Sequence, residues 1–414
     1  MTAASSTDPA RRAALDCLTQ VVDRGRPLDE AVERSFTRFK LAGRDRSFAR
    51  ALVSTALRRR GGLMHLVTRL LDRPPKGRAQ AVVPVLHLGL VQIFHMDVAD
   101  HAAVAATVPL AAKPHRGLVN AVLRRAVRER AALVPLIAPA GVDLPAWLVA
   151  RWQQTYGADT TAAMAAALRR EPPLDLTARD DAPSLADAVG GTLLPTGTVR
   201  LVQPQPVDTL PGFSDGAFWV QDAAAALPVT MLGDVAGARV GDLCAAPGGK
   251  TLQLAAAGAR VTAIDRAQGR LNRLRSNLDR CGLSAHIVEA DMMDWTPDRP
   301  FDALLLDAPC TATGTLRRHP DVAWHRRAED VATLADLQRR FAVRAADWLV
   351  PGGRMVVCTC SLEPEEGPDL LTQLLAARPD LRLEPIGADE PAAAFAADAG
   401  ALRTRPDQWP EQGG

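Results

Sequence analysis

The chain has 414 residues, of which 47% are hydrophobic and 23% are charged; this balance is typical of a globular protein of two to three domains and excludes a wholly disordered chain. No stretch reaches the ~20 apolar residues of a membrane span, and residues 1–9 lack the apolar core of a secretion signal. The six cysteines do not have the spacing of a small disulfide scaffold, so we expect a cytoplasmic protein with no membrane partner.

The charge is divided unevenly along the chain. Residues 1–140 contain 23 Lys and Arg against 11 Asp and Glu, whereas residues 141–414 contain 26 against 36. A basic segment joined to an acidic one predicts that the first part binds a polyanion. Solvated helix faces would explain the same composition, and charge alone does not separate the two interpretations.

The first 130 residues follow a helical pattern. Apolar residues recur at three- and four-residue steps within 14–22, 48–57 and 82–93, and Gly or Pro breakers separate these runs. We therefore expect an all-helical domain of about six or seven helices. Four arginines near its end share roughly one helical face, which suits contacts with phosphate groups. They are Arg124, Arg125, Arg128 and Arg130.

Several stretches of this segment are similar to a known RNA-binding domain. They are DRSFARALVSTALRRR at 45–60, LGLVQIF at 88–94, HAAV at 101–104 and NAVLR at 120–124. Together they resemble the domain related to the antitermination factor NusB. The resemblance implies a helical RNA-binding domain, to which we assign residues 1–140.

Residues 141–215 differ in character from the segments on either side. A short helix is expected around 147–156, followed by brief strand-like runs at 174–176 and 199–202 that Gly and Pro separate. We interpret this segment as a small α+β linker module that contacts RNA.

The remaining residues, 216–414, are expected to form an α/β domain. Short apolar strands alternate with helices, which is typical of a doubly wound, Rossmann-like parallel sheet. The strands are expected at 240–244, 260–264, 286–288, 303–306 and 354–358, and the helices at about 249–257, 267–281 and 330–348.

A glycine-containing turn follows the first of these strands. It consists of Cys244, Ala245, Ala246, Pro247, Gly248, Gly249 and Lys250. Such a turn before a helix lets the backbone approach a bound ligand. Its spacing is neither that of a dinucleotide-binding loop nor that of a P-loop, and taken alone an ordinary strand-to-helix turn explains it equally well.

Acidic residues after the next strands strengthen the case for a ligand. Asp265 ends the second strand, where its carboxylate can accept both hydroxyls of a ribose, and Asp291 follows the third, near the expected adenine edge. Asp307 ends the fourth strand. Each alone could cap a turn, but together with the glycine turn they predict an adenosine-type ligand at this edge of the sheet. Lys250 is the only lysine after residue 113, which indicates a need for a compact ammonium group.

Two cysteine-containing turns follow the fourth and fifth strands, LDAPC at 306–310 and CTCS at 358–361. Neighbouring parallel strands bring both turns to the same edge of the sheet. A thiolate that adds to carbon 6 of a cytosine raises the electron density at carbon 5, which can then attack the methyl group of a sulfonium. That reaction needs a reactive cysteine, an acid near N3 and a base for the proton on carbon 5.

Taken together, these residues closely resemble the RNA (cytosine-5) methyltransferase family, also called the Fmu/Sun family. Further matches are VQD at 220–222, DR at 265–266 through NL at 277–278, and RRHPDVAW at 317–324. With its NusB-like front, the chain is similar over almost its whole length to the small-subunit ribosomal RNA methyltransferase B subgroup. The resemblance implies S-adenosylmethionine as the methyl donor, no metal, and RNA as the partner, with 16S ribosomal RNA as the expected substrate.

The resemblance also implies roles for three residues. Cys360 would be the nucleophile, and Cys310 would assist proton removal and elimination. Asp307 would contact the base near N3 and the exocyclic amine while lying near the methyl donor. DNA cytosine-5 methyltransferases use a cysteine in a Pro-Cys pair after the fourth strand, so the second cysteine favours RNA.

Alternatives stay open at this point. The chain could methylate another RNA such as tRNA, could be an amino-group methyltransferase, or could be an RNA-binding assembly or antitermination factor with an inactive methylase domain. A zinc site would use Cys310, Cys358, Cys360 and His319, but this spacing is poor for zinc. We expect His319 and His325 on a surface loop near RNA, and a monomeric protein.

The end of the chain departs from the pattern of methyltransferases with this fold. A sixth strand is expected at 381–386, but the tail 403–414 contains no apolar run that would form a last strand between the fifth and sixth. We therefore expect the chain to lack its last strand, which leaves one edge of the fifth strand unpaired.

Overall fold

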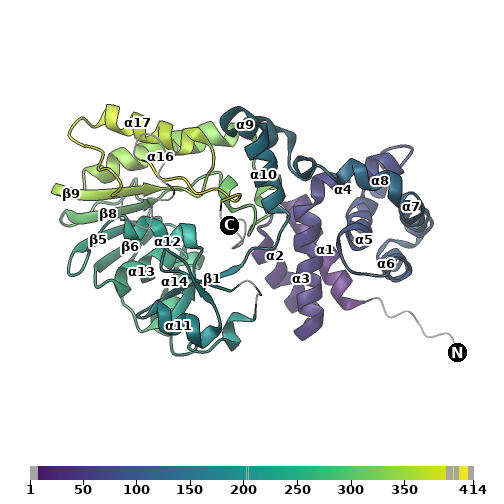
Figure 1. Ribbon diagram of the computed structural model, residues 1–414, viewed down its shortest axis with the longest axis horizontal. Coiled ribbons are helices and arrows are strands. Elements are labelled where there is room, and N and C mark those ends of the chain that lie inside the picture. The colour runs from purple at the N-terminus through teal and green to yellow at the C-terminus, as the bar shows by residue number, and fades with distance from the viewer. Residues whose placement is uncertain (1–7, 202, 204, 388–394, 396–400, 409–414) are drawn as a thin grey trace. The chain divides into compact units, whose positions relative to one another are not determined.

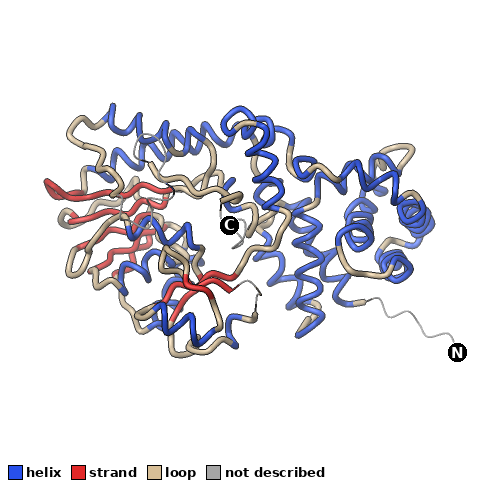
Figure 2. The backbone as a smooth tube through the Cα atoms, in the orientation of Figure 1, coloured by secondary structure: helices blue, strands red, loops and turns tan. Residues whose placement is uncertain are grey.

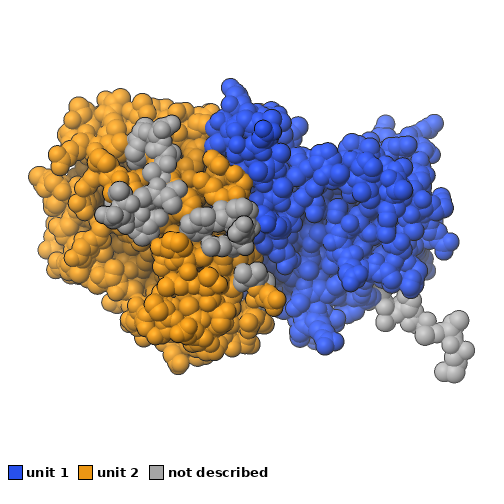
Figure 3. Space-filling view, in the orientation of Figure 1, with its two compact units in different colours: residues 1–171, 315–328 blue, residues 172–314, 329–414 orange. Residues whose placement is uncertain are grey.

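The computed structural model describes residues 8–201, 203, 205–387, 395 and 401–408. The chain forms two compact units, coloured separately in Figure 3. The helical unit comprises residues 1–171 and 315–328, and the sheet unit comprises residues 172–314 and 329–414. The short segment 315–328 therefore belongs to the helical unit, although in the sequence it lies between two stretches of the sheet unit.

The described part of the helical unit contains helices and no strand, as Figures 1 and 2 show. Its α-helices are α1 (Pro9–Arg24), α2 (Leu28–Arg38), α3 (Gly43–Arg58), α4 (Arg60–Leu70), α5 (Val82–His95), α6 (Asp100–Thr107), α7 (Arg116–Arg128), α8 (Arg130–Ile137), α9 (Ala146–Tyr156), α10 (Ala158–Leu168) and the short α15 (Val322–His325). The all-helical prediction is confirmed. Seven α-helices, α1 to α7, lie within the first 130 residues, as expected, and α8 follows after the single residue Glu129.

The first helix illustrates how local sequence sets these boundaries. The carboxylate of Asp8 accepts hydrogen bonds from the backbone N–H groups of Ala10 and Arg11, at 2.9 and 3.3 Å, and Pro9 occupies the first turn. Gly25 ends α1 in the left-handed region, with φ of 63°. An acceptor before the first turn and a glycine after the last are the usual signals of a helix start and end.

The centre of the helical unit is α5. Residues 77–95 are apolar and long enough to cross a bilayer by length and composition alone, but more than half of that stretch is buried. Side chains of α5 such as Leu86, Leu88 and Leu90 are fully buried in a core that α1, α3 and α7 complete. A helix that is apolar on all sides is typical of the interior of a helical domain.

The helical unit extends past residue 140, where the sequence suggested a domain boundary, because a buried carboxylate joins the two stretches. Asp143 Oδ2 lies 3.1 Å from Arg59 Nη1 and 2.7 Å from Arg169 Nε, and Asp143 is only 3% exposed. Since burial strengthens charged hydrogen bonds, this network ties α9 and α10 to the helices before them. The compact unit consequently ends at Glu171.

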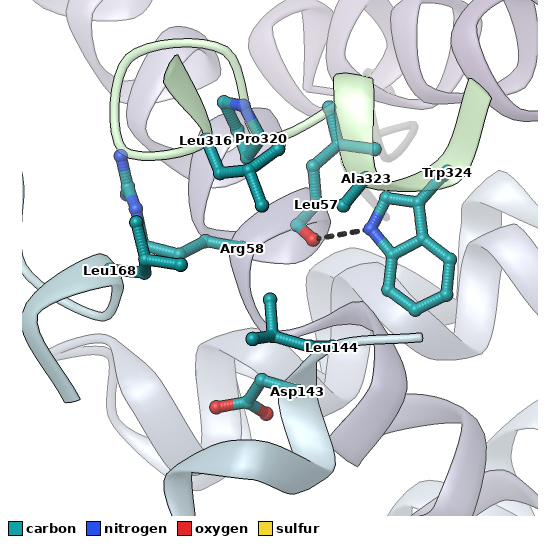
Figure 4. A pocket seen from close by; sticks show the side chains of 9 residues that line it. All are labelled: Leu57, Arg58, Asp143, Leu144, Leu168, Leu316, Pro320, Ala323 and Trp324. Atoms are coloured by element: carbon teal, nitrogen blue, oxygen red, sulfur yellow. Dashed lines mark hydrogen bonds between the residues drawn. The ribbon is translucent and has the colours of Figure 1, made fainter. Parts of the chain in front are cut away.

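The segment 315–328 completes the helical unit. The indole N–H of Trp324 donates to the carbonyl oxygen of Leu57 at 3.1 Å, and the guanidinium of Arg58 donates to the carbonyl oxygen of Arg317 at 3.1 Å. A small, mostly apolar pocket lies between these contacts (Figure 4). Its lining residues are Leu57, Arg58, Asp143, Leu144, Leu168, Leu316, Pro320, Ala323 and Trp324.

The sheet unit begins with a small antiparallel sheet of order β2-β3-β1-β4. Its elements are β1 (Leu174–Ala178), α11 (Ala182–Val189), β2 (Thr192–Leu193), β3 (Val199–Leu201) and β4 (Phe218–Val220). The guanidinium of Arg200 and the carboxylate of Asp175 form two parallel hydrogen bonds at 2.7 and 2.8 Å, and both side chains are buried. This paired charge holds β1 to β3 across their register.

The larger sheet is parallel, with order β7-β6-β5-β8-β9. Its strands are β5 (Arg239–Leu243), β6 (Arg260–Asp265), β7 (His286–Glu289), β8 (Phe301–Asp307) and β9 (Leu349–Cys358), and its helices are α12 (Ala223–Thr230), α13 (Gly249–Ala256), α14 (Gln268–Cys281), α16 (Ala328–Ala346) and α17 (Pro368–Ala377). The predicted Rossmann-like fold is confirmed, and the five strands and three helices expected between residues 240 and 358 are in place.

Both faces of this sheet are buried, as its continuous apolar strands indicated. Along β8, Leu304 and Leu306 pack with Phe341 of α16 and its neighbours. The alternate residues Ala303 and Leu305 belong to a different cluster that contains Leu254 of α13. Because side chains alternate between the faces of a strand, one apolar run supplies two cores.

The prediction of a sixth strand at 381–386 is wrong. Residues 381–387 form no strand, and in the described residues β9 pairs with β8 alone. Side chains hold this segment instead, since Leu381 packs against the core below β9 and Ile386 packs beside Leu227. Of the tail 403–414, on which the missing last strand was predicted, residues 409–414 lie outside the described residues, and that expectation stays a prediction.

Candidate functional site

The candidate site lies at the carboxyl ends of the parallel strands. The strand order places β5 beside β8, and the connections after these two strands lead in opposite directions, to β6 and to β9. That point is where ligands bind in open parallel sheets. The turns after β5, β8 and β9 contain the glycine turn, Asp307 with Cys310, and Cys360.

The glycine turn after β5 has a backbone that only some residues can adopt. Cys244 has a φ of 63° and Gly248 a φ of 108°, both in the left-handed region. A Cβ atom on Gly248 would lie 2.2 Å from Cδ1 of Leu274 in α14, so glycine is required there. Gly249 then begins α13, whose first N–H groups are directed toward the edge of the sheet.

Asp265 holds this turn beside the end of β6. One carboxylate oxygen accepts from the N–H of Ala246 at 3.2 Å, and the other accepts from the N–H of Ala267 at 2.8 Å and from Arg270 at 3.0 Å. Asp265 is 4% exposed. Each carboxylate oxygen has two lone pairs, so Asp265 positions the turn and keeps capacity for one further donor, at Oδ2.

Asp291 follows β7 and is about a third exposed. Its Oδ1 accepts from the N–H of Met293 at 2.9 Å, and its Oδ2 lies 3.7 Å from Arg266. The turn-capping function that the sequence allowed for this residue is therefore present. Its predicted position near an adenine edge stays a prediction.

Lys250 and Asp307 form the charged part of the site. Lys250 Nζ lies 2.7 Å from Asp307 Oδ2, and the lysine side chain is 14% exposed. Burial lowers the pKa of Lys250, but the neighbouring acidic groups, Asp307 first among them, together outweigh burial and hold that pKa above its usual value. Cys358 Sγ lies 3.7 Å from the other Asp307 oxygen. A charged lysine thus fixes the direction of the Asp307 carboxylate.

The two cysteine turns meet at their sulfur atoms. Cys310 Sγ and Cys360 Sγ are 3.3 Å apart, although the residues are 50 positions apart in the sequence. Cys310 is buried and Cys360 is exposed. Hydrogen bonding to Cys360, together with burial, raises the pKa of Cys310 well above its ordinary value. Cys310 is therefore a protonated thiol beside an accessible sulfur.

Cys358 differs from these two residues. It ends β9 within the sheet, and burial raises its pKa well above the ordinary value. A thiol with a raised pKa is a poor nucleophile at neutral pH. The structure thus separates Cys358 from the pair formed by Cys310 and Cys360.

The sequence interpretation missed Asp242, which precedes the glycine turn. It is fully buried within β5, accepts a hydrogen bond from the hydroxyl of Thr251 in α13, and has a pKa that burial raises to about 7. This hydrogen bond joins the strand before the turn to the helix after it. An aspartate inside an otherwise apolar strand, VGDL at 240–243, is the signal that could have identified it.

Comparison with known proteins identifies the family. The model of the family described as 16S rRNA methyltransferase RsmB/F matches residues 229–413, and that of the NusB family matches residues 8–128. The ribosomal RNA small subunit methyltransferase B of Citrobacter koseri is 35% identical over 91% of this chain and 92% of its own length. That of Salmonella arizonae is 36% identical over 92% and 93%. The chain belongs to the 16S rRNA methyltransferase RsmB/F family.

Solved structures agree with the fold of an RsmB/F protein. The crystal structure of PH0851 has a TM-score of 0.76 and 20% identity, and the match covers 98% of this chain and 97% of that one. A methyltransferase homolog protein from Pyrococcus horikoshii has a TM-score of 0.51 and 25% identity, over 63% of this chain and 90% of that one. The two-part architecture is therefore shared with a solved protein along nearly its full length.

In the NusB-like part of this RsmB/F protein, the four arginines at 124–130 fall into two groups. Arg125 donates to Glu129 and to the carbonyl oxygen of Leu70, and Arg130 donates to the carbonyl oxygen of Ile93. Arg124 and Arg128 are exposed. Contacts with phosphate groups stay a prediction, for which Arg124 and Arg128 are the accessible candidates.

The two histidines expected on a surface loop also differ. His325 is half-buried, and its Nε2 lies 2.9 Å from the carbonyl oxygen of Val21 in α1. His319 is more exposed, with its Nδ1 3.9 Å from Asp29. For His325 the expectation was wrong, because α15 packs into the helical core. In the described residues, no three His, Cys, Asp or Glu side chains converge as a metal site would require.

Proposed function

We propose that this protein transfers a methyl group from S-adenosylmethionine to carbon 5 of a cytosine in 16S ribosomal RNA, in the cytoplasm. The observation that carries the proposal is the pair of sulfur atoms, 3.3 Å apart, at the same sheet edge as the glycine turn and the Lys250–Asp307 pair. The names of the relatives support a ribosomal substrate.

The residues at this edge fit S-adenosylmethionine. The turn from Cys244 to Gly249 packs closely against α14, since a Cβ at Gly248 would collide with Leu274. The backbone N–H groups at the start of the following helix suit the polar part of a ligand. Asp265 ends β6 with one acceptor position left for a ribose hydroxyl, and Asp291 follows the neighbouring strand β7. When bound, S-adenosylmethionine supplies an electrophilic methyl group on a sulfonium.

Cys360 is the proposed nucleophile, because it is the exposed member of the sulfur pair. Its thiolate forms a bond to carbon 6 of the cytosine, and the electron pair of the carbon 5–carbon 6 double bond becomes available at carbon 5. Carbon 5 then forms a bond to the methyl group as the methyl–sulfur bond breaks. The sulfur of Cys310 lies 3.3 Å from that of Cys360, within hydrogen-bond distance of the proposed nucleophile.

Cys310 acts when the product is released. The proton on carbon 5 leaves to a base at this edge with the assistance of Cys310, and the electron pair of that bond restores the double bond. The bond between Cys360 and carbon 6 breaks, and its electron pair returns to sulfur. A thiol 3.3 Å away can stabilise the departing thiolate by a hydrogen bond.

Asp307 is the proposed group that recognises the base. A carboxylate accepts hydrogen bonds, and cytosine presents an exocyclic amine next to N3, whereas uracil presents an oxygen at that position. Lys250 orients the Asp307 carboxylate through a 2.7 Å contact. Asp307 thus selects cytosine and lies near the methyl donor.

The test is methyl transfer from labelled S-adenosylmethionine to unmethylated 16S ribosomal RNA and to small ribosomal particles. Nucleoside analysis by mass spectrometry and bisulfite mapping should find 5-methylcytosine at one position or a few. Transfer to the exocyclic amine, or no transfer to any RNA, would contradict the proposal. The second outcome would favour an RNA-binding factor with an inactive methylase domain.

Transfer RNA is the matched comparison substrate. Methylation of tRNA at a rate equal to or above that of ribosomal RNA would leave the proposed reaction unchanged but would identify tRNA as the substrate. The Cys360→Ala variant is the blank for both substrates, because it retains the fold and the cofactor turn without the proposed nucleophile.

A further inference from the structure

Glu366 lies in a short turn after the fifth parallel strand and is 1% exposed. The proposed reaction gives it no part, and nothing in the sequence singled it out. A buried carboxylate away from the surface requires several hydrogen-bond donors to offset the loss of water. The identity of these donors shows what Glu366 holds together.

Each oxygen of Glu366 accepts hydrogen bonds from groups beside the two cysteines. Oε1 accepts from the backbone N–H of Thr311 at 2.9 Å, and Oε2 accepts from the hydroxyl groups of Thr311 and Ser361. Thr311 directly follows Cys310, and Ser361 directly follows Cys360. One carboxylate therefore joins the two turns at the residues next to the reactive sulfur atoms.

Gln338 of α16 completes the arrangement. Its amide N–H group donates to Glu366 Oε1 at 2.8 Å and to the carbonyl oxygen of Pro309 at 2.8 Å. The residues on both sides of Cys310 are consequently held by the same Gln338–Glu366 pair. The carbonyl oxygen of Glu366 also accepts from the hydroxyl of Thr359 at 2.9 Å, so Cys360 is held on both sides as well.

We propose that Glu366 is a positioning residue that sets the separation of the Cys310 and Cys360 sulfur atoms. The inference rests on the proposed function for its catalytic consequence, but the separation itself is a property of the protein alone. The two turns belong to different strands and are joined by a carboxylate whose length fits the gap. The length of the Glu366 side chain, rather than its charge, sets the separation of the two sulfur atoms.

Two conservative variants separate reach from charge. Glu366→Gln keeps the length, and its amide can donate to the hydroxyl oxygens of Thr311 and Ser361 while its carbonyl still accepts from the N–H of Thr311. Glu366→Asp keeps the charge but is one methylene shorter, so it cannot contact both turns. Asp369→Asn, an exposed carboxylate three residues later in α17, is the matched control.

The first measurement is the steady-state rate of methyl transfer. Glu366→Asp should lower kcat about 100-fold, the cost of misplacing reacting groups by about an ångström, with KM for RNA and affinity for S-adenosylmethionine unchanged. Glu366→Gln should stay within about tenfold of the wild type, since its hydrogen-bond geometry is nearly preserved. Asp369→Asn should match the wild type.

The second measurement needs no RNA and no methyl transfer. Diamide removes one hydrogen from each of two neighbouring thiols, which become a disulfide while the azo group is reduced to a hydrazine. The rate of Cys310–Cys360 linkage, followed by peptide mass spectrometry, reports the sulfur separation. Linkage should be rapid in the wild type, Glu366→Gln and Asp369→Asn, and at least about tenfold slower in Glu366→Asp, because exchange requires close approach of the two sulfurs.

Linkage and kcat together decide the matter. Wild-type linkage and kcat in Glu366→Asp would overturn the inference, as would a Glu366→Gln variant that is folded and links normally but is as slow as Glu366→Asp. If the wild-type protein makes no 5-methylcytosine but the linkage rates follow the expected order, the proposed function fails and the positioning role stands.

Discussion

Two polar clusters follow β8 in the sequence, and the protein uses them in opposite ways. The first, from Asp307 to Thr311, lies at the edge of the parallel sheet, where Asp307 is about a third exposed and the sulfur of Cys310 lies 3.3 Å from that of the exposed Cys360. The second, from Arg317 to His325, is packed into the helical unit, where it forms hydrogen bonds with residues of α1, α2 and α3.

The difference lies in the partners of the polar groups. In the second cluster Asp321 accepts from the backbone N–H of Leu28 at 3.0 Å, and His325 and Trp324 bond to carbonyl oxygens. Such contacts are satisfied by the fold itself and stabilise it. In the first cluster the partners are other side chains, Lys250 with Asp307 and Cys310 with Cys360, which can exchange a partner for a ligand. A motif with charged residues therefore indicates function only when its partners can be exchanged.

The largest expected effects come from the two cysteines of the first cluster. Cys360→Ala should lower methyl transfer below about one ten-thousandth of the wild-type rate, as loss of a covalent nucleophile does, and should form no RNA adduct. Cys310→Ala should form an adduct that persists on a denaturing gel, because addition proceeds and elimination stalls. Neither variant should change the melting temperature by more than a few degrees. An adduct trapped by the Cys360 variant and not by the Cys310 variant would reverse the assigned roles.

The next prediction concerns Asp265 and asks whether this buried carboxylate of the sheet unit binds the methyl donor in addition to holding its turn. Asp265→Ala should weaken binding of S-adenosylmethionine by about 1–3 kcal/mol, the cost of unpaired hydroxyls and of a loosened turn. Isothermal titration calorimetry measures the change. Asp279→Ala, an exposed acid on α14, is the control. Unchanged affinity in the Asp265 variant would restrict that residue to capping its turn.

Asp321 tests the claim that polar groups of the second cluster stabilise the fold and do not bind the methyl donor. Asp321→Ala should lower the free energy of unfolding by about 1–3 kcal/mol, because it leaves the N–H of Leu28 buried without its acceptor. Affinity for S-adenosylmethionine should not change at temperatures where the protein stays folded. Asp97→Ala, in an exposed turn of the same unit, should have little effect on either. A stable Asp321 variant that had lost methyl transfer would show that the two clusters are not separated as we describe.

The smallest expected effect concerns Asp242, a buried acid close to the first cluster. Burial raises its pKa from 3.8 to about 7, so between these values the folded state holds a proton that the unfolded state releases. Its stabilising contribution is fully present below pH 3.8 and is lost as the pH rises through about 7. The melting temperature of the wild type should fall between pH 5 and pH 8 by a few degrees more than that of Asp242→Asn. Parallel curves would place the pKa of Asp242 near its ordinary value.

The sequence alone determined the parallel sheet and most of its edge. Strands buried on both faces are continuous apolar runs, and glycine, proline and acidic residues mark where they end, so β5 to β9 and the turns after them were predicted from local pattern. Parallel strands all end at one edge, and Asp307, Cys310 and Cys360 could therefore be assigned to a common site. Helix signals such as Asp8 and Gly25 are equally local.

Only the tertiary structure decided which distant residues become partners. It assigned 315–328 to the helical unit, buried His325, held Leu381 by packing instead of in a sixth strand, and brought two sulfur atoms within 3.3 Å. The periodicity of apolar residues and the residue types that form turns depend only on residues close together in the sequence. Burial, desolvation and the reach of a carboxylate such as Glu366 depend on segments that meet only after the chain has folded.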